Sequence, residues 1–355
     1  MKRFLIPVLI LTAVNAVAAG RGRVIRTPHG TPSVWTAPNC TTTYGLPGFY
    51  FTRDEGRTVS LNPHPRPVNS GVLVVVTDVP NRMFALFGDG LYDSVDAGCN
   101  WSLRSRLPLQ PVSTLTAAPG GRAYGWSYAD GRILRISASS FDVVEASGRV
   151  MGFGVDPADA QHVVAVTQAK IQESFDGGSN WSDREVFAFP MIETAAVDPT
   201  DVRHIAISYV ATVGAVPRVE VTRDGGITWQ RAPEGVRAWK LAFSPADPNA
   251  IWMTGRAWPP VGAAPLNAYQ SADGGKTFDC LAPPSTLYFN NLTLAPSPAD
   301  AHVAAQASSF GGLAIIDAAS KAIRFAPANS EWISVTWSPV PGVIYLTSSD
   351  SVIIN

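Results

Sequence analysis

The sequence predicts an all-β protein, a single β-propeller for which seven blades are preferred and eight remain an alternative. Short runs in which apolar and polar residues alternate, such as RVEVT and HIAIS, recur along the chain, whereas few long runs have helical periodicity. The 355 residues include 30 glycines and 29 prolines, and only 15% are charged, as expected of a large globular chain with many turns. A recurring turn motif is the third indication, since periods of roughly 40 to 50 residues are typical of propeller blades.

The first 19 residues have the pattern of an export signal. Lys2 and Arg3 precede an apolar run, and Ala16 and Ala18 fit a signal peptidase site, with Ala19 as the alternative last residue removed. The apolar run is too short for a membrane anchor, which needs roughly 20 residues. We therefore expect residues 1–19 to be removed and residues 20–355 to form one soluble propeller domain, secreted or periplasmic, that is not inserted in a membrane.

Five segments of the chain share one turn motif. Each has Ser or Thr, any residue, Asp, any residue, Gly, any residue, Thr or Asn, and then an aromatic residue, although the first copy has Val59 in the last place. Degenerate copies lie in GRILRISASSFDVV and in LAIIDAASKAIRF at 313–325. The five segments are TRDEGRTV from Thr52, SVDAGCNW from Ser94, SFDGGSNW from Ser174, TRDGGITW from Thr222 and SADGGKTF from Ser271.

The residue types of the motif suit a tight hairpin turn. A short acid accepts hydrogen bonds from the backbone amides of its own turn, and glycine permits the left-handed conformation that the reversal needs. The aromatic residue is expected to pack between adjacent blades, where it buries a large apolar area. We predict a structural rather than a catalytic role for Asp54, Asp96, Asp176, Trp181, Asp224, Trp229 and Asp273.

The motif resembles the Asp-box, or BNR, repeat of sialidases, xyloglucan-cleaving glycosidases, sortilin-type receptors and photosystem II assembly propellers. The resemblance implies a propeller in which the repeats form turns between the third and fourth strands of the blades, on the bottom face. Function in such propellers is expected on the opposite, top face, where loops meet over the central channel.

A second repeated element indicates the number of blades. Segments such as DPADAQHVVAV from Asp156 and DPTDVRHIAIS from Asp198 link an inner strand to the next strand. The last inner strands, ISVTWSP and VIYLTSS, would be completed by strands from the N-terminus, which closes the ring without a free edge. The surplus segments SVIIN and RVIRT leave eight blades possible. The seven inner-strand candidates start near Gly71, Val112, Val150, Ile192, Lys240, Leu292 and Ile333.

Three cysteines, Cys40, Cys99 and Cys280, allow one disulfide and one remaining thiol in an oxidising compartment. Cys40 and Cys99 fall in neighbouring repeats, which favours that pair. The three are too scattered for a zinc site, since none has a close neighbour.

Neither a metal, a cofactor nor nucleic acid is expected to bind. His162, His204 and His302 occupy one repeat position in three different blades, so they should lie around the bottom rim without converging on a metal. The formal net charge is −1, and the chain has no run of Lys and Arg that would indicate a nucleic-acid partner.

Candidate binding residues lie in the predicted top-face connections. Two of these are unusually long, YVATVGAVPR at 209–218 and GRAWPPVGAAPLN at 255–267, and long loops are often functional. Aromatic residues beside amides and carboxylates suit a sugar or an extended peptide. For Trp239 and Trp332, packing within the inner strands is the alternative. The candidates are Glu193, Trp239, Arg256, Trp258, Tyr288, Asn290 and Trp332.

We predict a monomeric, non-catalytic binding module whose partner is a protein, a peptide or a glycan. The alternative is a glycoside hydrolase of the sialidase-like or xyloglucan-cleaving type, with Glu193 and Glu331 as the carboxylates, which would have to lie roughly 5 to 10 Å apart. The N-terminal region lacks the Arg-Ile-Pro or Arg-Leu-Pro motif of sialidases, and the chain holds one propeller instead of the two of xyloglucan-cleaving enzymes. These departures favour the binding module.

Overall fold

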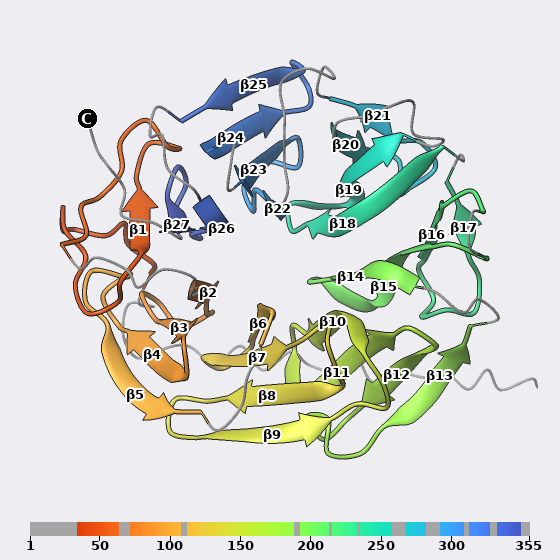
Figure 1. Ribbon diagram of the computed structural model, residues 1–355, viewed down its shortest axis with the longest axis horizontal. Helices are drawn as coiled ribbons and strands as arrows, with labels where there is room; N and C mark the ends of the chain where they lie inside the picture. Colours follow the sequence, from red (N-terminus) through yellow and green to blue (C-terminus); the bar gives the residue numbers. More distant parts are fainter. Residues whose placement is uncertain are drawn as a thin grey trace, which may run out of the picture. The chain divides into compact units, whose positions relative to one another are not determined.

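The computed structural model describes residues 34–63, 72–107, 112–187, 192–212, 215–232, 235–257, 267–281, 292–308, 312–326 and 332–348. The chain divides into two units, Met1–Val34 and Trp35–Asn355, and the second contains every strand discussed below. Seven β-sheets form a ring in this second unit (Figure 1), so the fold is a seven-bladed β-propeller, as predicted. None of the described segments forms a helix with the length and apolar character that crossing a membrane requires.

Blades 1 to 6 are antiparallel sheets of four strands, which follow one another from the central channel outward. Blades 1 to 3 comprise β2 (Val72–Val76), β3 (Met83–Phe87), β4 (Gly90–Ser94) and β5 (Ser102–Arg106); β6 (Thr114–Ala118), β7 (Arg122–Trp126), β8 (Arg132–Ile136) and β9 (Phe141–Glu145); and β10 (Val150–Asp156), β11 (Asp159–Thr167), β12 (Lys170–Ser174) and β13 (Ser182–Val186). Blades 4 to 6 comprise β14 (Ile192–Asp198), β15 (Asp201–Tyr209), β16 (Arg218–Thr222) and β17 (Gln230–Arg231); β18 (Val236–Ser244), β19 (Asp247–Ala257), β20 (Asn267–Ser271) and β21 (Asp279–Cys280); and β22 (Leu292–Pro296), β23 (Val303–Ser308), β24 (Gly312–Asp317) and β25 (Ala322–Phe325).

Blade 7 closes the ring by joining the two ends of the propeller. Its strands are β26 (Trp332–Trp337), β27 (Ile344–Ser348) and β1 (Phe49–Thr52), so an N-terminal strand pairs with two C-terminal ones. This confirms the expected closure. The turn after β1 has Val59 in the aromatic place, and no regular fourth strand follows it within the described residues up to Pro63. Instead, Ser60 N–H donates to the Phe51 carbonyl at 2.8 Å, and Phe51 N–H donates to Ser60 Oγ at 2.9 Å.

The inner strands of blades 3, 4, 5 and 7 share a β-bulge near their start, where the register with the next strand shifts by one residue. A bulge leaves one extra residue in the strand and changes the direction of its side chain. It also interrupts the alternation of inward and outward side chains by which a strand is recognised in a sequence. This explains why β18 begins at Val236, four residues before the start predicted at Lys240. The extra residues are Met151, Glu193, Trp239 and Ile333.

The five repeat turns, at 52–59, 94–101, 174–181, 222–229 and 271–278, share one hydrogen-bond pattern. In the third, Ser174 Oγ donates to Asp176 Oδ1 at 2.8 Å and accepts from Gly178 N–H at 2.8 Å. Asn180 donates to Asp176 through its side-chain amide at 2.7 Å and its backbone N–H at 2.8 Å. The bonds from Asn180, followed by the one from Ser174, lower the pKa of Asp176 to about 2. Thr228 lowers the pKa of Asp224 to about 2 in the same way.

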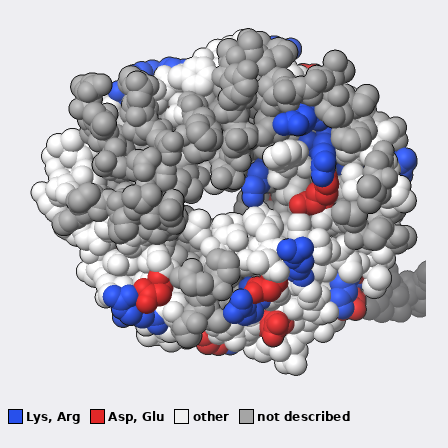
Figure 2. Space-filling view, in the orientation of Figure 1, with Lys and Arg blue, Asp and Glu red and all other residues white. Residues whose placement is uncertain are grey.

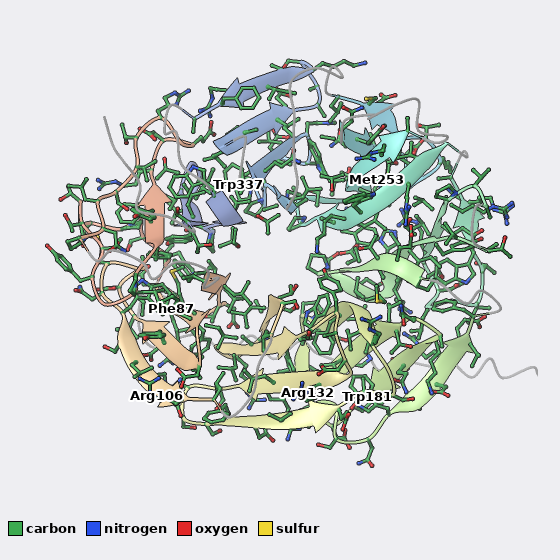
Figure 3. The ribbon with its side chains drawn as sticks, viewed as in Figure 1. Phe87, Arg106, Arg132, Trp181, Met253 and Trp337 are labelled. Carbon is green, nitrogen blue, oxygen red and sulfur yellow. A yellow bond between two sulfur atoms is a disulfide. The ribbon has the colours of Figure 1, made fainter. Side chains whose placement is uncertain are left out.

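Aromatic residues at the end of the repeat turns lie at the boundary with the preceding blade. Trp101 packs edge-to-face on Phe49 of blade 7, with ring centres 4.9 Å apart, and Trp229 lies 6.1 Å from Phe187 of blade 3. Trp181 and Val144 of β9 both pack against the buried apolar cluster that blades 2 and 3 share (Figure 3). These contacts bury large apolar surfaces between blades, which stabilises the ring.

The turn of blade 6 between β24 and β25 departs from the repeat and holds Lys321 in a left-handed conformation, with φ of 55°. The Lys321 side chain is exposed. We expect Lys321→Gly to raise the free energy of unfolding by about 1 kcal/mol, because an L-residue in this conformation costs roughly 1–2 kcal/mol and glycine loses part of that gain through chain entropy. Chemical denaturation measures the change. Lys321→Ala is the control and should leave stability unchanged; equal stability of the two variants would contradict the prediction.

Candidate functional site

The top face of the propeller is the end of the ring at which the inner strands begin, and the bottom face carries the repeat turns. On the top face, acidic and basic side chains lie beside the central opening over β14 and β18 (Figure 2). They belong to blades 4 and 5, whose inner strands β14 and β18 are neighbours in the ring. This is the region in which the structure brings predicted site residues together.

An ion pair links these two blades. Glu193 is the bulge residue of β14, and Arg237 lies on β18. Arg237 Nε donates to Glu193 Oε2 at 3.0 Å, and Arg237 Nη2 donates to Glu193 Oε1. The guanidinium therefore engages both carboxylate oxygens in the parallel geometry that gives the strongest such pairs.

An exposed tryptophan with an arginine beside its ring lies next to this ion pair. Trp239 is the bulge residue of β18 and is 45% exposed. The guanidinium carbon of Arg256, on the adjacent strand β19, lies 5.6 Å from the centre of the Trp239 ring, a distance at which a cation–π contact contributes about 0.5–1 kcal/mol at exposed sites. Arg256 Nε is buried, and among the described residues it has no hydrogen-bond partner.

The next residue of β18, Lys240, makes a contact across the top of the ring. Its Nζ donates to the hydroxyl of Tyr128 at 2.7 Å and lies 4.3 Å from the centre of the Tyr128 ring. Tyr128 follows β7 in blade 2 and packs edge-to-face on Trp126, with ring centres 5.0 Å apart. The contact thus joins blade 2 to blade 5, although 112 residues separate the two positions in the chain.

Lys240 and Tyr128 also line a cavity of about 380 Å³ in the central channel. The inner strands of several blades contribute hydroxyl and small apolar side chains to its wall, among them Thr116, Thr194 and Thr336. Lys240 is the only charged residue among the lining residues in the described part of the chain.

The predicted binding residues therefore divide into three groups. Glu193, Trp239 and Arg256 lie together on the top face. Trp332 is fully buried and packs edge-to-face on Tyr50 at 5.5 Å, so its assignment as a binding residue is wrong and the packing alternative holds. It precedes the bulge residue of β26, at the position that faces the core. Trp258, Tyr288, Asn290 and Glu331 lie outside the described residues.

Sequence reasoning missed Arg237, Lys240 and Tyr128. Arg237 and Lys240 flank Trp239 in the run RAWK, and a rule that weighs charged neighbours of a candidate aromatic residue would have found them. Nothing near Tyr128 in the sequence indicates its contact with Lys240, because that contact arises only when the ring closes.

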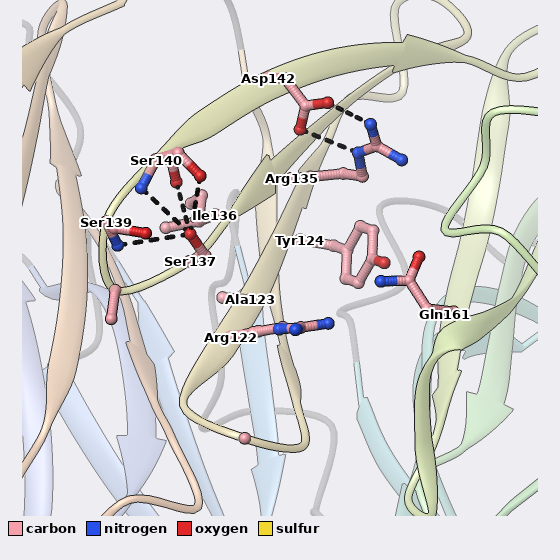
Figure 4. Close-up of a pocket in the computed structure, with 12 residues that line it drawn as sticks. Arg122, Ala123, Tyr124, Arg135, Ile136, Ser137, Ser139, Ser140, Asp142 and Gln161 are labelled. Carbon is pink, nitrogen blue, oxygen red and sulfur yellow. Dashed lines mark hydrogen bonds and ion pairs between the residues drawn. The ribbon is translucent and has the colours of Figure 1, made fainter.

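The bottom face carries a larger cavity of about 560 Å³ between blades 2 and 3 (Figure 4). Arg135 Nε donates to Asp142 Oδ1 at 2.8 Å, and Arg135 Nη1 donates to the carbonyl of Asp176 in the neighbouring repeat turn at 3.2 Å. Tyr124 donates its hydroxyl proton to the Ala160 carbonyl at 2.7 Å. Arg135 of β8 and Tyr124 of β7 thus tie the strands of blade 2 to turns of blade 3, which gives this part of the cavity wall a structural role.

The three histidines lie on three different blades. His162 Nδ1 is 2.8 Å from Asp156 Oδ2 and its Nε2 is 2.7 Å from Glu173 Oε1 in blade 3, whereas His204 Nδ1 is 2.8 Å from a carboxylate oxygen in blade 4. His302 precedes β23 in blade 6. Both ring nitrogens of His162 thus face carboxylates, and within the described ranges no group of three His, Cys, Asp or Glu residues is arranged so that it could hold a metal ion.

Comparison with known proteins identifies one relative by sequence and several by fold. No family model matches the chain. The chain is 31% identical over 308 residues to the dispase autolysis-inducing protein of Streptomyces mobaraensis, a match that covers 83% of this chain and 82% of the relative. Three solved structures are similar in fold: YCF48 bound to D1 peptide (TM-score 0.55, 13% identity, 88% of this chain and 100% of that one), YCF48 from Cyanidioschyzon merolae (0.55, 16%, 80% and 97%) and an ancestral GH74 enzyme (0.56, 14%, 80% and 45%).

Identities of 13–16% show the fold alone, which is the β-propeller. The sequence match is closer and extends over most of both proteins. The chain therefore belongs to the family of the dispase autolysis-inducing protein.

Proposed function

We propose that this protein is an exported, non-catalytic β-propeller of the Asp-box type that binds a protease and promotes its self-cleavage. The observation that carries the proposal is the match to a protein named for inducing the autolysis of dispase, which spans 83% of this chain. The signal-like residues 1–19 support export, and the five repeat turns support the Asp-box assignment.

The top face of blades 4 and 5 is the proposed binding surface. Binding energy at protein interfaces concentrates in a few residues, among which Trp, Tyr and Arg are enriched. Trp239 and Arg256 offer this combination in one contact, with nearly half of the indole exposed. The propeller of YCF48 has been solved with a D1 peptide, which supports a protein or peptide as the partner of a propeller of this shape.

Contacts of Glu193 favour binding over glycoside hydrolysis. Hydrolysis of a glycosidic bond needs one carboxyl group to donate a proton and a second to act as base or nucleophile. Both oxygens of Glu193 instead accept hydrogen bonds from Arg237. The likeness to a GH74 enzyme concerns the fold, and fold alone does not imply activity.

The proposal is tested by mixing the purified exported protein with dispase and following fragmentation of the protease on gels, together with binding to dispase held inactive by a reversible inhibitor. Fragmentation should accelerate with the propeller concentration and then saturate. Trp239→Ala should weaken binding by about thirtyfold or more, since truncation of a hot-spot residue costs roughly 2 kcal/mol or more.

Phe175→Ala is the matched control, because Phe175 is also an exposed aromatic residue, 66% accessible, but lies in a repeat turn on the bottom face. It should bind dispase as the unchanged protein does. Absence of accelerated fragmentation would contradict the proposed function, and equal losses in the two variants would contradict the choice of face.

A further inference from the structure

We infer that the central channel of the propeller receives a carboxylate from an acidic segment of the partner protein, and that Lys240 binds it. The inference rests on the proposed function, because it names the chemistry of the partner segment that the top face recognises. It is carried by Lys240, the one charged side chain among the described residues that line the cavity of the central channel.

Lys240 has hydrogen-bonding capacity that its described neighbours leave open. An ammonium group has three N–H donors, and one of them is directed at the Tyr128 hydroxyl. No carboxylate in the described ranges forms an ion pair with Lys240, and every other residue that lines the cavity there is uncharged. Tyr128 holds the ammonium in place through its ring and hydroxyl without neutralising it.

The charges around the channel mouth favour an anionic partner. Two acids of the described residues lie in this region, and each is already paired: Glu193 with Arg237, and Asp130, two residues after Tyr128, with Arg132. Arg256 lies over an indole ring instead of a carboxylate. Arg149 is exposed and donates to the carbonyl of Ala129, the residue after Tyr128. A cleft lined by one sign of charge between low-dielectric walls concentrates the electric field and attracts the opposite charge.

The shape of the site favours an acidic side chain on a polypeptide. The cavity of about 380 Å³ is within the usual range for ligand pockets, roughly 300–1,000 Å³. Trp239, the residue before Lys240, exposes its ring on the same face. A segment that places an Asp or Glu on Lys240 would therefore set its neighbouring side chains on an aromatic surface, which a free anion would not use.

The test uses two fluorescent peptides of 12 residues, in which Glu residues and one Tyr alternate with Gly and Ser in the first, and Gln replaces every Glu in the second. Fluorescence anisotropy at low salt should show the Glu peptide binding at least about tenfold more tightly, as expected for a charge-assisted hydrogen bond. The difference should shrink in 0.5 M salt, because ions screen the attraction.

Lys240→Gln should remove most of the preference for the Glu peptide, whereas Lys240→Arg, which keeps the charge, should retain it. Lys170→Gln is the control, since Lys170 is already paired with Asp183 at 2.8 Å on the outer strands of blade 3. Thermal unfolding of each variant checks that the propeller is intact. Equal binding of the two peptides to the unchanged protein, or an unchanged preference in an intact Lys240→Gln variant, would overturn the inference.

The outcomes separate this inference from the proposed function. If the protein binds dispase and accelerates its fragmentation but does not distinguish the two peptides, the proposed function stands and the carboxylate site is wrong. If it prefers the Glu peptide through Lys240 but neither binds nor fragments dispase, the carboxylate site stands and the protease is the wrong partner.

Discussion

Replacing Trp332 with alanine is expected to lower the free energy of unfolding by about 3–5 kcal/mol, the range observed when a large buried aromatic residue is truncated. The side chain is fully buried and packs on Tyr50 of β1. Leu346 of β27 belongs to the same apolar cluster. The cavity would therefore open where strands from the two ends of the propeller meet. Since blade 7 closes the ring, the loss should appear as reduced stability of the whole domain.

The matched control is Trp239→Ala, which removes the same side chain from an exposed position. Truncation of Trp239 removes its cation–π contact with Arg256. The free energy of unfolding should therefore fall by less than about 1 kcal/mol. Urea denaturation measures both variants, and the dispase-binding assay is run on the folded protein. We expect Trp332→Ala to be unstable but competent to bind while folded, and Trp239→Ala to be stable but weak in binding. Similar stability of the two variants would contradict the assignment of Trp332 to the core.

Trp239 and Trp332 were both predicted to bind a partner because their positions relative to the bulge, which differ by one residue, cannot be distinguished in the sequence. Both lie near the start of an inner strand, and both strands have a bulge there. Trp239 is the extra residue of its bulge, whereas Trp332 immediately precedes the extra residue of β26. The residues at the position of Trp332 in the other bulged strands are also buried, with at most 1% exposure, and they are Val150, Ile192 and Ala238. A one-residue shift exchanges the two faces of a strand.

The architecture was predictable because each repeat turn has a local cause. Asp, Gly and the flanking polar residues hydrogen-bond to one another within eight residues, so the motif is complete in the sequence. The inner strands between its copies then indicate the number of blades. The first motif copy, at 52–59, precedes any complete blade in the sequence. It therefore indicates that the strand before it belongs to the last blade, and β1 does pair with β27.

The candidate site depends on contacts that are not local. Glu193 and Arg237 lie on neighbouring blades, and Tyr128 and Lys240 lie on blades 2 and 5. Such pairs form only because the ring brings the starts of different inner strands around one channel. Glu193, Trp239 and Arg256 could be chosen from the sequence by their residue types. Which charged side chains at the channel mouth are paired, and which are not, is known only from the folded ring.

The disulfide between Cys40 and Cys99, which the sequence favoured, gives the second large prediction. Its removal in a Cys40→Ser/Cys99→Ser variant should lower the free energy of unfolding by about 4 kcal/mol. The chain-entropy estimate is about 3 kcal/mol for a closed loop of 15 residues and about 4.7 for one of 100, and this bond joins positions 59 residues apart.

The position of the bond adds a reason to expect a large effect. Cys99 lies in the repeat turn of blade 1, and the segment that follows Cys40 runs along this turn: Tyr44 N–H donates to the Cys99 carbonyl at 2.9 Å, and Trp101 N–H donates to the Tyr44 carbonyl at 2.9 Å. A few residues later the chain enters β1, the closing strand. The disulfide therefore limits the positions that the β1 segment can occupy in the unfolded chain. In the folded protein it also holds the segment that precedes β1 against blade 1.

Chemical denaturation with and without a thiol reductant measures the effect. The unchanged protein in reductant should be as unstable as the double serine variant, and reductant should not affect that variant further. Cys280→Ser is the matched control, because Cys280 is exposed on β21 and outside the bond; it should keep full stability in the absence of reductant. A double variant as stable as the oxidised protein would mean that the hydrogen bonds around Tyr44 and the strand pairing of β1 suffice to close the ring. A loss well above 4 kcal/mol would instead mean that β1 leaves blade 7 when the bond is absent, since the entropy of the loop alone cannot account for more.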